Sequence, residues 1–397
     1  MLPTSTAHPV PADLPARRHL SYQELDILHA LRGFCAFYVV IYHAKFILWS
    51  GGRAYLEAFP RSTWGIGQYV AFLLDLLSSA GYEMVIFFFV LSGFFIRYAQ
   101  LKRHRPAGAF YLNRIVRIYP PYLVSLLLAA LVLVLLATQV PQVLNPNLDR
   151  ELNTVLTQAW AELRSFDFWA ALRTLVFVRV GELYVGNNVV YWSLLPEAIF
   201  YLLIPLVFRN VRWYLLASVG LYLLGAWLHH SGAGQSEIVH AVLDYNLFFA
   251  LGTVLYDVVT GSNLIERVRR LPRWLTLAVL GGLLLAIIGL ALLKLKALAA
   301  LVAGIMAVLS VLVLLAGHVS RQNPLVRVLH RLGIFSFSLY LYHYPLLLLG
   351  YGLLVQLTGQ LVIYQRVYWL AVPIVTLLCY GLYWVTERVF INYFRKV

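Results

Sequence analysis

The stretch LRGFCAFYVVIYH, residues 31–43, carries two ionisable side chains inside an apolar segment that is long enough to span a membrane. Arg32 and His43 are eleven positions apart. At roughly 100° per residue this is close to three turns, so both side chains project from one helix face, about 16 Å apart along the axis. A charge at bilayer depth costs at least ~2.5 kcal/mol on insertion scales, so such groups usually face a bundle interior or a wet cavity and serve a function. The alternative is an arginine that reaches the lipid headgroups and a hydrogen-bonded core histidine.

The composition indicates a polytopic membrane protein. Of the 397 residues, 61% are hydrophobic and 12% are charged, whereas soluble domains average about 45–50% and about 25%. Cys35 and Cys379 both lie in apolar segments, so neither a disulfide framework nor a thiolate metal site is expected. The net charge of +14 does not indicate nucleic-acid binding. The reason is that the basic residues are dispersed among apolar segments and form no solvated stripe.

Ten apolar stretches are long enough to cross about 30 Å of hydrocarbon, which predicts an all-α polytopic membrane protein with a bundle of about ten transmembrane helices. They are roughly residues 27–49, 80–100, 117–138, 188–208, 211–229, 240–260, 273–293, 297–317, 333–355 and 367–390. Residues 1–22 are polar and proline-bearing and contain no apolar signal-peptide core. They would form a cytoplasmic N-terminal tail, and residues 23–397 would form the transmembrane domain.

The distribution of basic residues predicts the orientation of the chain. If the amino terminus is cytoplasmic, the inner segments collect 20 of the 31 Lys and Arg residues and the outer segments hold nine. The positive-inside rule therefore favours a multi-pass protein with both termini in the cytoplasm. Residues 140–187 would then form an outer loop, and their many aromatic side chains predict short amphipathic helices at the surface. Residues 60–79 are expected to form a re-entrant or interfacial segment.

A basic pair follows the second predicted span, in the sequence FYLNRIVRIYPPY. Arg114 and Arg117 are three residues apart, so they share one helix face at the predicted inner mouth of the bundle. Paired guanidinium groups can form forked hydrogen bonds to phosphate oxygens. Binding of lipid headgroups is the alternative for such a pair.

A carboxylate lies near the middle of the fourth predicted span, YWSLLPEAIFYLLIPL. Glu197 would need a cation or an imidazole beside it to remain charged there, and Arg32 or a histidine would be natural company. A purely structural buried ion pair is the alternative. In the second span, Ser92 and Gly93 are explained by close helix packing.

The ninth predicted span, GIFSFSLYLYHYPLLLL, is unusually rich in hydrogen-bonding side chains. They are Ser336, Ser338, Tyr340, Tyr342 and His343. Such a helix is typical of the wall of a polar cavity. In the last span, Glu387 and Arg388 are expected to form an ion pair at the inner surface.

Several classes of catalytic motif are absent from the sequence. There is no P-loop, HExxH, cysteine cluster, GxSxG elbow or Asp-rich metal motif. No fixed-period repeat or soluble catalytic domain is evident either, so any chemistry must come from the bundle. A metal-independent acid/base mechanism that uses histidine and glutamate is what remains.

These segments together resemble the acyltransferase-3 family of integral membrane O-acyltransferases, which modify sugars, lipids and antibiotics. The likeness rests on Arg32 with ten residues before His43, FFVLSGFFI at 88–96, FYLNRIVRIYPPY at 110–122, WSLLPEAIFY at 192–201, LYLYHYP at 339–345 and the terminal Glu387. Each motif alone is weak, but their order and placement run from the first span to the last. Two positions differ: Ile86 stands where many relatives have an acidic residue, and Val389 where relatives often have Pro.

The resemblance implies a ten-helix acyltransferase bundle in the bacterial inner membrane, with His43 as the catalytic histidine. The donor would be acyl-CoA from the cytoplasm, usually acetyl-CoA, and the acceptor a glycan or lipid-linked saccharide at or beyond the outer leaflet. Membrane lipids would be the other partners, and neither a metal nor nucleic acid is expected. The main rival is a transporter or flippase of a glycoconjugate, and a second is a structural partner of a polysaccharide assembly complex.

The resulting hypothesis gives His43 the role of general base toward an acceptor hydroxyl, with Glu197 orienting or charge-balancing it. Arg32, Arg114 and Arg117 would bind the CoA phosphates from the inner side. The remaining expected donor-site residues are Tyr122, Ser336, Tyr342 and His343. His43 lies about 16 Å beyond Arg32 by helix rise, where a pantetheine arm could deliver its thioester.

Overall fold

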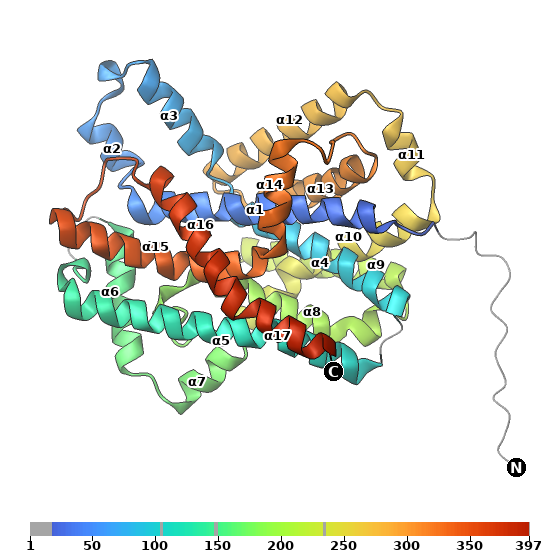
Figure 1. Cartoon of the computed structure of the whole chain (residues 1–397), viewed down its shortest axis with the longest axis horizontal. Coiled ribbons are helices and arrows are strands. Elements are labelled where there is room, and N and C mark those ends of the chain that lie inside the picture. The colour runs from blue at the N-terminus through green and yellow to red at the C-terminus, as the bar shows by residue number, and fades with distance from the viewer. Residues whose placement is uncertain (1–17, 104–105, 147–149, 233–235, 397) are drawn as a thin grey trace, which may run out of the picture.

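The structure, a computed structural model, describes residues 18–103, 106–146, 150–232 and 236–396, and every regular element in these ranges is a helix (Figure 1). The predicted tail, residues 1–22, therefore lies mostly outside the described residues, as do residues 147–149 of the predicted outer loop. The all-α polytopic class predicted from the composition is confirmed.

Nine helical segments in the described part of the chain are long and apolar enough to cross a bilayer. They are α1 (Tyr22–Leu48), α3 with α4 (Ile66–Leu77 and Gly81–Arg103), α5 (Ala107–Gln139), α9 (Val211–His230), α10 (Glu237–Gly261), α12 (Arg273–Leu292), α13 (Lys296–Leu315), α15 (Ser336–Thr358) and α16 with α17 (Tyr368–Val385 and Glu387–Lys396). Each corresponds to a predicted span, except that α3 lies in residues 60–79, which were expected to form a re-entrant or interfacial segment.

The predicted fourth span, residues 188–208, is shorter than the others. It consists of a 3-10 turn, η4 (Val189–Ser193), followed by α8 (Leu194–Val207). Its direction follows from its neighbours: Tyr191 packs against Tyr122 and Tyr201 against Phe110, with ring centroids 5.1 and 6.2 Å apart. These two contacts show that α5 and α8 run antiparallel. Successive membrane spans must alternate in direction, and the short segment fits this alternation as the fourth of the ten predicted spans.

The connections between the long helices carry shorter ones. These are α2 (Arg53–Ala58), η1 (Arg61–Thr63), η2 (Pro141–Val143), α6 (Glu151–Arg164), α7 (Phe168–Leu175), η3 (Val185–Asn187), α11 (Leu264–Arg269) and α14 (Pro324–Ile334). The short helices predicted within residues 140–187 are confirmed as α6 and α7. On α6, the buried Asn153 amide donates to the Val143 carbonyl at 2.8 Å and to the Tyr351 hydroxyl at 3.1 Å, which fixes α6 to the bundle. On α7, the side chains of Phe168 and Trp169 are both 68% exposed.

Helix α1 runs through the middle of the molecule, with α15 beside it and α14 across it (Figure 1). The crossing of α1 and α14 is close because both helices have a glycine there. A Cβ atom on Gly33 would lie 1.8 Å from the Leu329 carbonyl oxygen, and one on Gly333 would lie 1.8 Å from the His29 carbonyl oxygen. The packing role predicted for Gly93 is confirmed at the crossing of α4 and α10, where its Cβ would lie 2.1 Å from the Phe249 carbonyl oxygen.

The chain breaks between α14 and α15 at Phe335, and this break sets where α15 begins. Glu387 caps the new helix: its buried carboxylate accepts hydrogen bonds from the Ser338 hydroxyl at 2.7 Å and the Ser338 amide at 3.3 Å. The expected ion pair between Glu387 and Arg388 is wrong, because the Arg388 guanidinium lies 3.4 Å from the ring centroid of Trp384 instead. Glu387 is therefore part of the framework that holds α15.

Candidate active site

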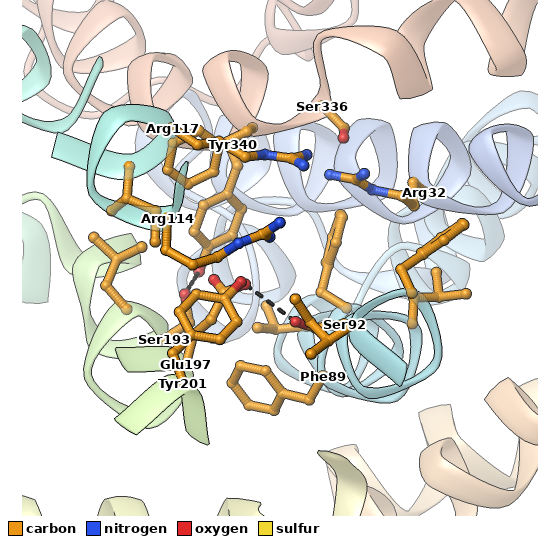
Figure 2. A pocket seen from close by; sticks show the side chains of 18 residues that line it. Arg32, Phe89, Ser92, Arg114, Arg117, Ser193, Glu197, Tyr201, Ser336 and Tyr340 are labelled. Atoms are coloured by element: carbon orange, nitrogen blue, oxygen red, sulfur yellow. Dashed lines mark hydrogen bonds between the residues drawn. The ribbon is translucent and has the colours of Figure 1, made fainter. Parts of the chain in front are cut away.

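A pocket lies among α1, α4, α5, α8 and the start of α15 (Figure 2). Its empty volume, including the part open to solvent, is about 820 Å³. Three of the residues predicted to bind the donor, Arg32, Arg114 and Arg117, line it together with Ser336. Residues that are 304 positions apart in the chain, Arg32 and Ser336, thus share one wall.

The three guanidinium groups extend into one space (Figure 2). Arg114 lies against two aromatic rings, 5.6 Å from the centroid of Phe110 and 5.5 Å from that of Tyr201. Across the described ranges, none of the three arginines forms a salt bridge with a carboxylate, and the buried Nε of Arg114 and Oγ of Ser336 have no hydrogen-bond partner. Three half-buried cations that form no salt bridge, with one carboxylate, Glu197, in the same pocket, leave an excess of positive charge. Together with the unsatisfied hydroxyl of Ser336, they fit an anionic group that carries several acceptor oxygens.

Glu197 lies on the wall of the same pocket, next to Tyr201 and on the side of Arg114 (Figure 2). Its Oε1 accepts a hydrogen bond from the Ser92 hydroxyl at 3.2 Å and another from the Tyr201 hydroxyl. Arg32 was predicted to lie near Glu197, and the two residues do line the same pocket. The proposed contact with His43 is absent: within the described part of the chain, no hydrogen bond joins Glu197 to a histidine. One partner, Ser92, comes from α4, and the other, Tyr201, lies one turn after Glu197 on α8 itself.

The partner of His43 is His343, on α15. Nδ1 of His43 lies 2.8 Å from Nε2 of His343, and Nδ1 of His343 lies 2.9 Å from the carbonyl oxygen of Leu339. A carbonyl only accepts, so His343 must carry its proton on Nδ1 and donate it to Leu339. Its Nε2 is then the acceptor, and the proton of the His43–His343 hydrogen bond belongs to Nδ1 of His43.

This chain of hydrogen bonds leaves Nε2 of His43 as an unprotonated nitrogen. No described residue forms a hydrogen bond with this atom. The imidazole is held in place by Tyr42 on one side and Tyr344 on the other, with ring centroids 5.1 and 5.2 Å away. A histidine with a free, unprotonated Nε2 and a tautomer fixed by a second histidine is chemically able to accept a proton as a general base.

Tyr340 lies between the arginine pocket and the histidine pair. It lines the pocket, and its ring centroid is 6.2 Å from that of His343. Its hydroxyl donates to the Val190 carbonyl at 2.9 Å and lies 2.9 Å from the Ser193 hydroxyl. His43 itself is not among the residues that line the pocket. The candidate site therefore has two parts, a cationic pocket and a histidine pair, with Tyr340 at their boundary.

Two tyrosines predicted to bind the donor have protein partners elsewhere. The Tyr122 hydroxyl donates to the Thr174 carbonyl at 2.7 Å. The Tyr342 hydroxyl lies 3.1 Å from the Pro121 carbonyl oxygen and 3.0 Å from the Thr386 hydroxyl. Neither residue lines the arginine pocket, and His343 lies at the histidine pair instead. The two tyrosines thus fasten helices to one another, because their hydroxyl groups are already satisfied.

Three polar residues of the pocket were not expected from the sequence. Ser92 had been assigned to helix packing, yet its hydroxyl bonds Glu197. Tyr201 lies one helical turn after Glu197, a spacing that could have indicated the contact. Ser193 pairs with Tyr340 from another helix, which no local pattern reveals.

The fold and the site define a polytopic membrane protein with a cationic pocket beside a pair of hydrogen-bonded histidines. The sequence profile of the family described as Acyltransferase domain, acyltransferase-3, matches residues 25–387, which is nearly the whole chain. The chain therefore belongs to the acyltransferase-3 family of membrane acyltransferases. No curated protein and no solved structure matches it.

Proposed function

We propose that the protein is an O-acyltransferase of the bacterial inner membrane that moves an acyl group, most simply acetyl, from acyl-CoA to a hydroxyl of a glycan or glycoconjugate. The observation that carries the proposal is the fixed tautomer of His43. The His343 and Leu339 contacts hold the proton on Nδ1 and leave Nε2 free to accept one. A hydroxyl is a poor nucleophile at neutral pH until a base of this kind takes its proton.

In the proposed reaction, Nε2 of His43 accepts the proton of the acceptor hydroxyl as its oxygen attacks the thioester carbonyl. The tetrahedral intermediate collapses, the C–S bond breaks, and the CoA thiolate leaves and takes up the proton. His43 carries a positive charge in between. The neutral Nε2 of His343 accepts the hydrogen bond from Nδ1 of His43 throughout, which stabilises that charge on the half-buried imidazole.

The arginine pocket is the proposed site for the phosphates of acyl-CoA. Three guanidinium groups without carboxylate partners would neutralise the negative nucleotide part of the donor. Arg32 and His43 lie eleven residues apart on α1, which is about 16 Å along a helix. The pantetheine arm would bridge this interval past Tyr340 and bring the thioester to the histidine pair.

The test compares wild type with His43→Ala in acetyl transfer from radiolabelled acetyl-CoA to glycoconjugates in membranes of the source cells. We expect turnover to fall by ~10² or more, because general base catalysis contributes about 10²- to 10⁴-fold. Yield, thermal stability and acetyl-CoA binding of the purified variant should remain close to wild type.

The matched control is His318→Ala, which removes a buried histidine that pairs with Thr276 at 3.0 Å and does not line the arginine pocket. This variant should lose stability but keep its activity per folded molecule. A well-folded His43→Ala protein that acetylates at the wild-type rate would rule out the proposed mechanism. Loss of stability with unchanged specific activity would make His43 a packing residue like His318.

A further inference from the structure

A second cluster of ionisable side chains lies where α9 ends and α10 begins. His229 is in the last turn of α9, and His240 and Asp244 stand one turn apart near the start of α10. Oδ2 of Asp244 lies 3.1 Å from Nε2 of His229 and 2.9 Å from Nδ1 of His240. One potential ligand atom from each residue lies within 4.8 Å of the other two.

These separations are close to those of a tetrahedral metal site. With metal–ligand bonds of about 2.0–2.1 Å, two ligand atoms of tetrahedral Zn²⁺ are about 3.3 Å apart. The two measured contacts with Asp244 are a few tenths of an ångström shorter, as hydrogen bonds are. A metal ion in their place would displace the proton from each of those imidazole nitrogens. Two imidazoles and one carboxylate are ligands that suit Zn²⁺.

The backbone of α9 makes room for the carboxylate. Gly225 lies one turn before His229 on the same helix face, and a Cβ atom there would come within 2.8 Å of Oδ1 of Asp244. With any other residue, the carboxylate would have to turn away or the helices to separate. The glycine thus allows Asp244 to reach both histidines between two packed helices.

The cluster lines a large pocket that is separate from the arginine pocket. Its empty volume, including open solvent, is about 1650 Å³, and Arg179 and Lys296 are among the residues that line it. The side chains of His229 and His240 are 43% and 39% exposed, so the nitrogen atoms are accessible from this space. Glu237, also in the pocket, is occupied by the Tyr184 hydroxyl and by Arg179. The three cluster residues therefore offer three potential ligand atoms beside the open space of the pocket.

We propose that His229, His240 and Asp244 bind one Zn²⁺ ion, with the fourth coordination position open to this pocket. Three protein ligands with an open position form a site that can bind an oxygen from water or from a ligand in the pocket. The cationic Arg179 and Lys296 nearby would favour an anionic oxygen there. The metal site is independent of acyl transfer by His43, because its residues belong to a different pocket.

The test uses the purified full-length protein in detergent, without a histidine tag, and Co²⁺ and Zn²⁺ as probes. Wild type should bind about one Co²⁺ per chain with the intense visible absorption of a tetrahedral site, and Zn²⁺ should displace it. Zn²⁺ should also raise the midpoint of thermal unfolding, since a ligand that binds only the folded state stabilises it. These readouts do not depend on enzymatic activity.

The decisive variants are His240→Gln and Asp244→Asn. In His240→Gln the glutamine can still donate a hydrogen bond to Asp244, but it removes the imidazole ligand. A cluster held only by hydrogen bonds would therefore persist in this variant, whereas a metal site would be lost. Both variants should lose the bound Co²⁺ and the Zn²⁺-induced stabilisation while unfolding at the metal-free wild-type temperature. The control His230→Ala, which removes the exposed neighbour of His229, should bind as wild type. Absence of metal binding by wild type, or unchanged binding by both variants, would overturn the proposal.

Discussion

Arg114 and Arg117 show how much a single residue's role depends on its surroundings. Their three-residue spacing placed them on one face, as predicted, but the same spacing suits lipid headgroups. What favours donor binding is that Arg32, from another helix, extends into the same space with Ser336 (Figure 2). A cationic pocket enclosed by five helical segments is better suited to a discrete phosphorylated ligand than to a bilayer surface.

The first prediction concerns the affinity for the donor. Replacing Arg114 and Arg117 together by glutamine should weaken binding of acetyl-CoA to the purified protein by roughly 10- to 100-fold per arginine, because a hydrogen bond to a charged group contributes about 1.5–3 kcal/mol. Isothermal titration calorimetry would measure this. Arg212→Gln, an exposed arginine at the same end of the bundle, is the control and should bind normally. Unchanged affinity in the double variant would remove both residues from the donor site.

His343 contacts a residue on a distant helix, which its position within its own span could not indicate. The sequence indicated that α15 lines a polar cavity, and His343 was expected beside the donor. Its actual position is 300 residues along the chain from His43 and in hydrogen-bond contact with it. In the proposed mechanism it holds the proton of His43 on Nδ1 and is therefore a positioning residue. Glu197, which was expected to orient or charge-balance His43, instead accepts hydrogen bonds from Ser92 and Tyr201.

The second prediction tests that positioning role. In His343→Leu the side chain can no longer accept the hydrogen bond from Nδ1 of His43, so the free base loses its fixed tautomer and its charge stabilisation. Turnover should fall by roughly 10²-fold or more while the KM for acetyl-CoA stays near wild type. In His343→Gln the amide can still donate to Leu339 and accept from His43, so part of the turnover should return. Equal activity in the leucine and glutamine variants would contradict the positioning role.

Among the elements, α14 and α15 set the register of the site. The break at Phe335 starts α15 beside Arg32, and two turns later His343 faces His43. The close crossing of α1 and α14 through Gly33 and Gly333 fixes the position of the break. The sequence predicted one span over 333–355 and gave no indication that the preceding residues form a separate helix that packs against α1.

The third prediction concerns this crossing. Gly33→Ala and Gly333→Ala should each destabilise the protein by at least about 1–3 kcal/mol, because the added methyl group meets a backbone carbonyl that cannot move without separating the helices. The midpoint of thermal unfolding in detergent would report the loss. Gly350→Ala on α15, where a Cβ has no neighbour within 4 Å, is the matched control and should leave the midpoint unchanged or slightly raised. A Gly33→Ala protein as stable as the control would show that the crossing is looser than described.

At the level of the whole molecule, contacts between neighbouring helices give each one a direction. Tyr82 meets Tyr245 and Arg97 meets Asp257, so α4 and α10 run parallel, as the second and sixth spans should. The short η4–α8 segment fits the same alternation. With an inside amino terminus, the end of the bundle where Arg150 bonds the carbonyls of Ile47 and Leu361, just before α6, faces outward, as the distribution of Lys and Arg predicts.

The fourth prediction tests this orientation. The only two cysteines, Cys35 and Cys379, are buried, so a single engineered cysteine can be labelled against a low background. An impermeant maleimide applied to intact cells should label Ser165→Cys, which is exposed between α6 and α7. Gln322→Cys, exposed before α14, should be labelled only after lysis. The opposite pattern would reverse the proposed topology.

The sequence by itself determined the membrane class, nearly all of the spans and the common face of Arg32 and His43, because hydropathy and helical periodicity are local properties that 20 residues suffice to express. It also identified all three arginines that line the pocket, Arg32, Arg114 and Arg117. Only the tertiary structure decided that His43 pairs with His343 and not with Glu197, and that His229 joins His240 and Asp244 on the next helix. Those pairings depend on the depth and rotation of one helix against another. Glycine crossings and the break before α15 set these quantities, and no pattern within a single span encodes them.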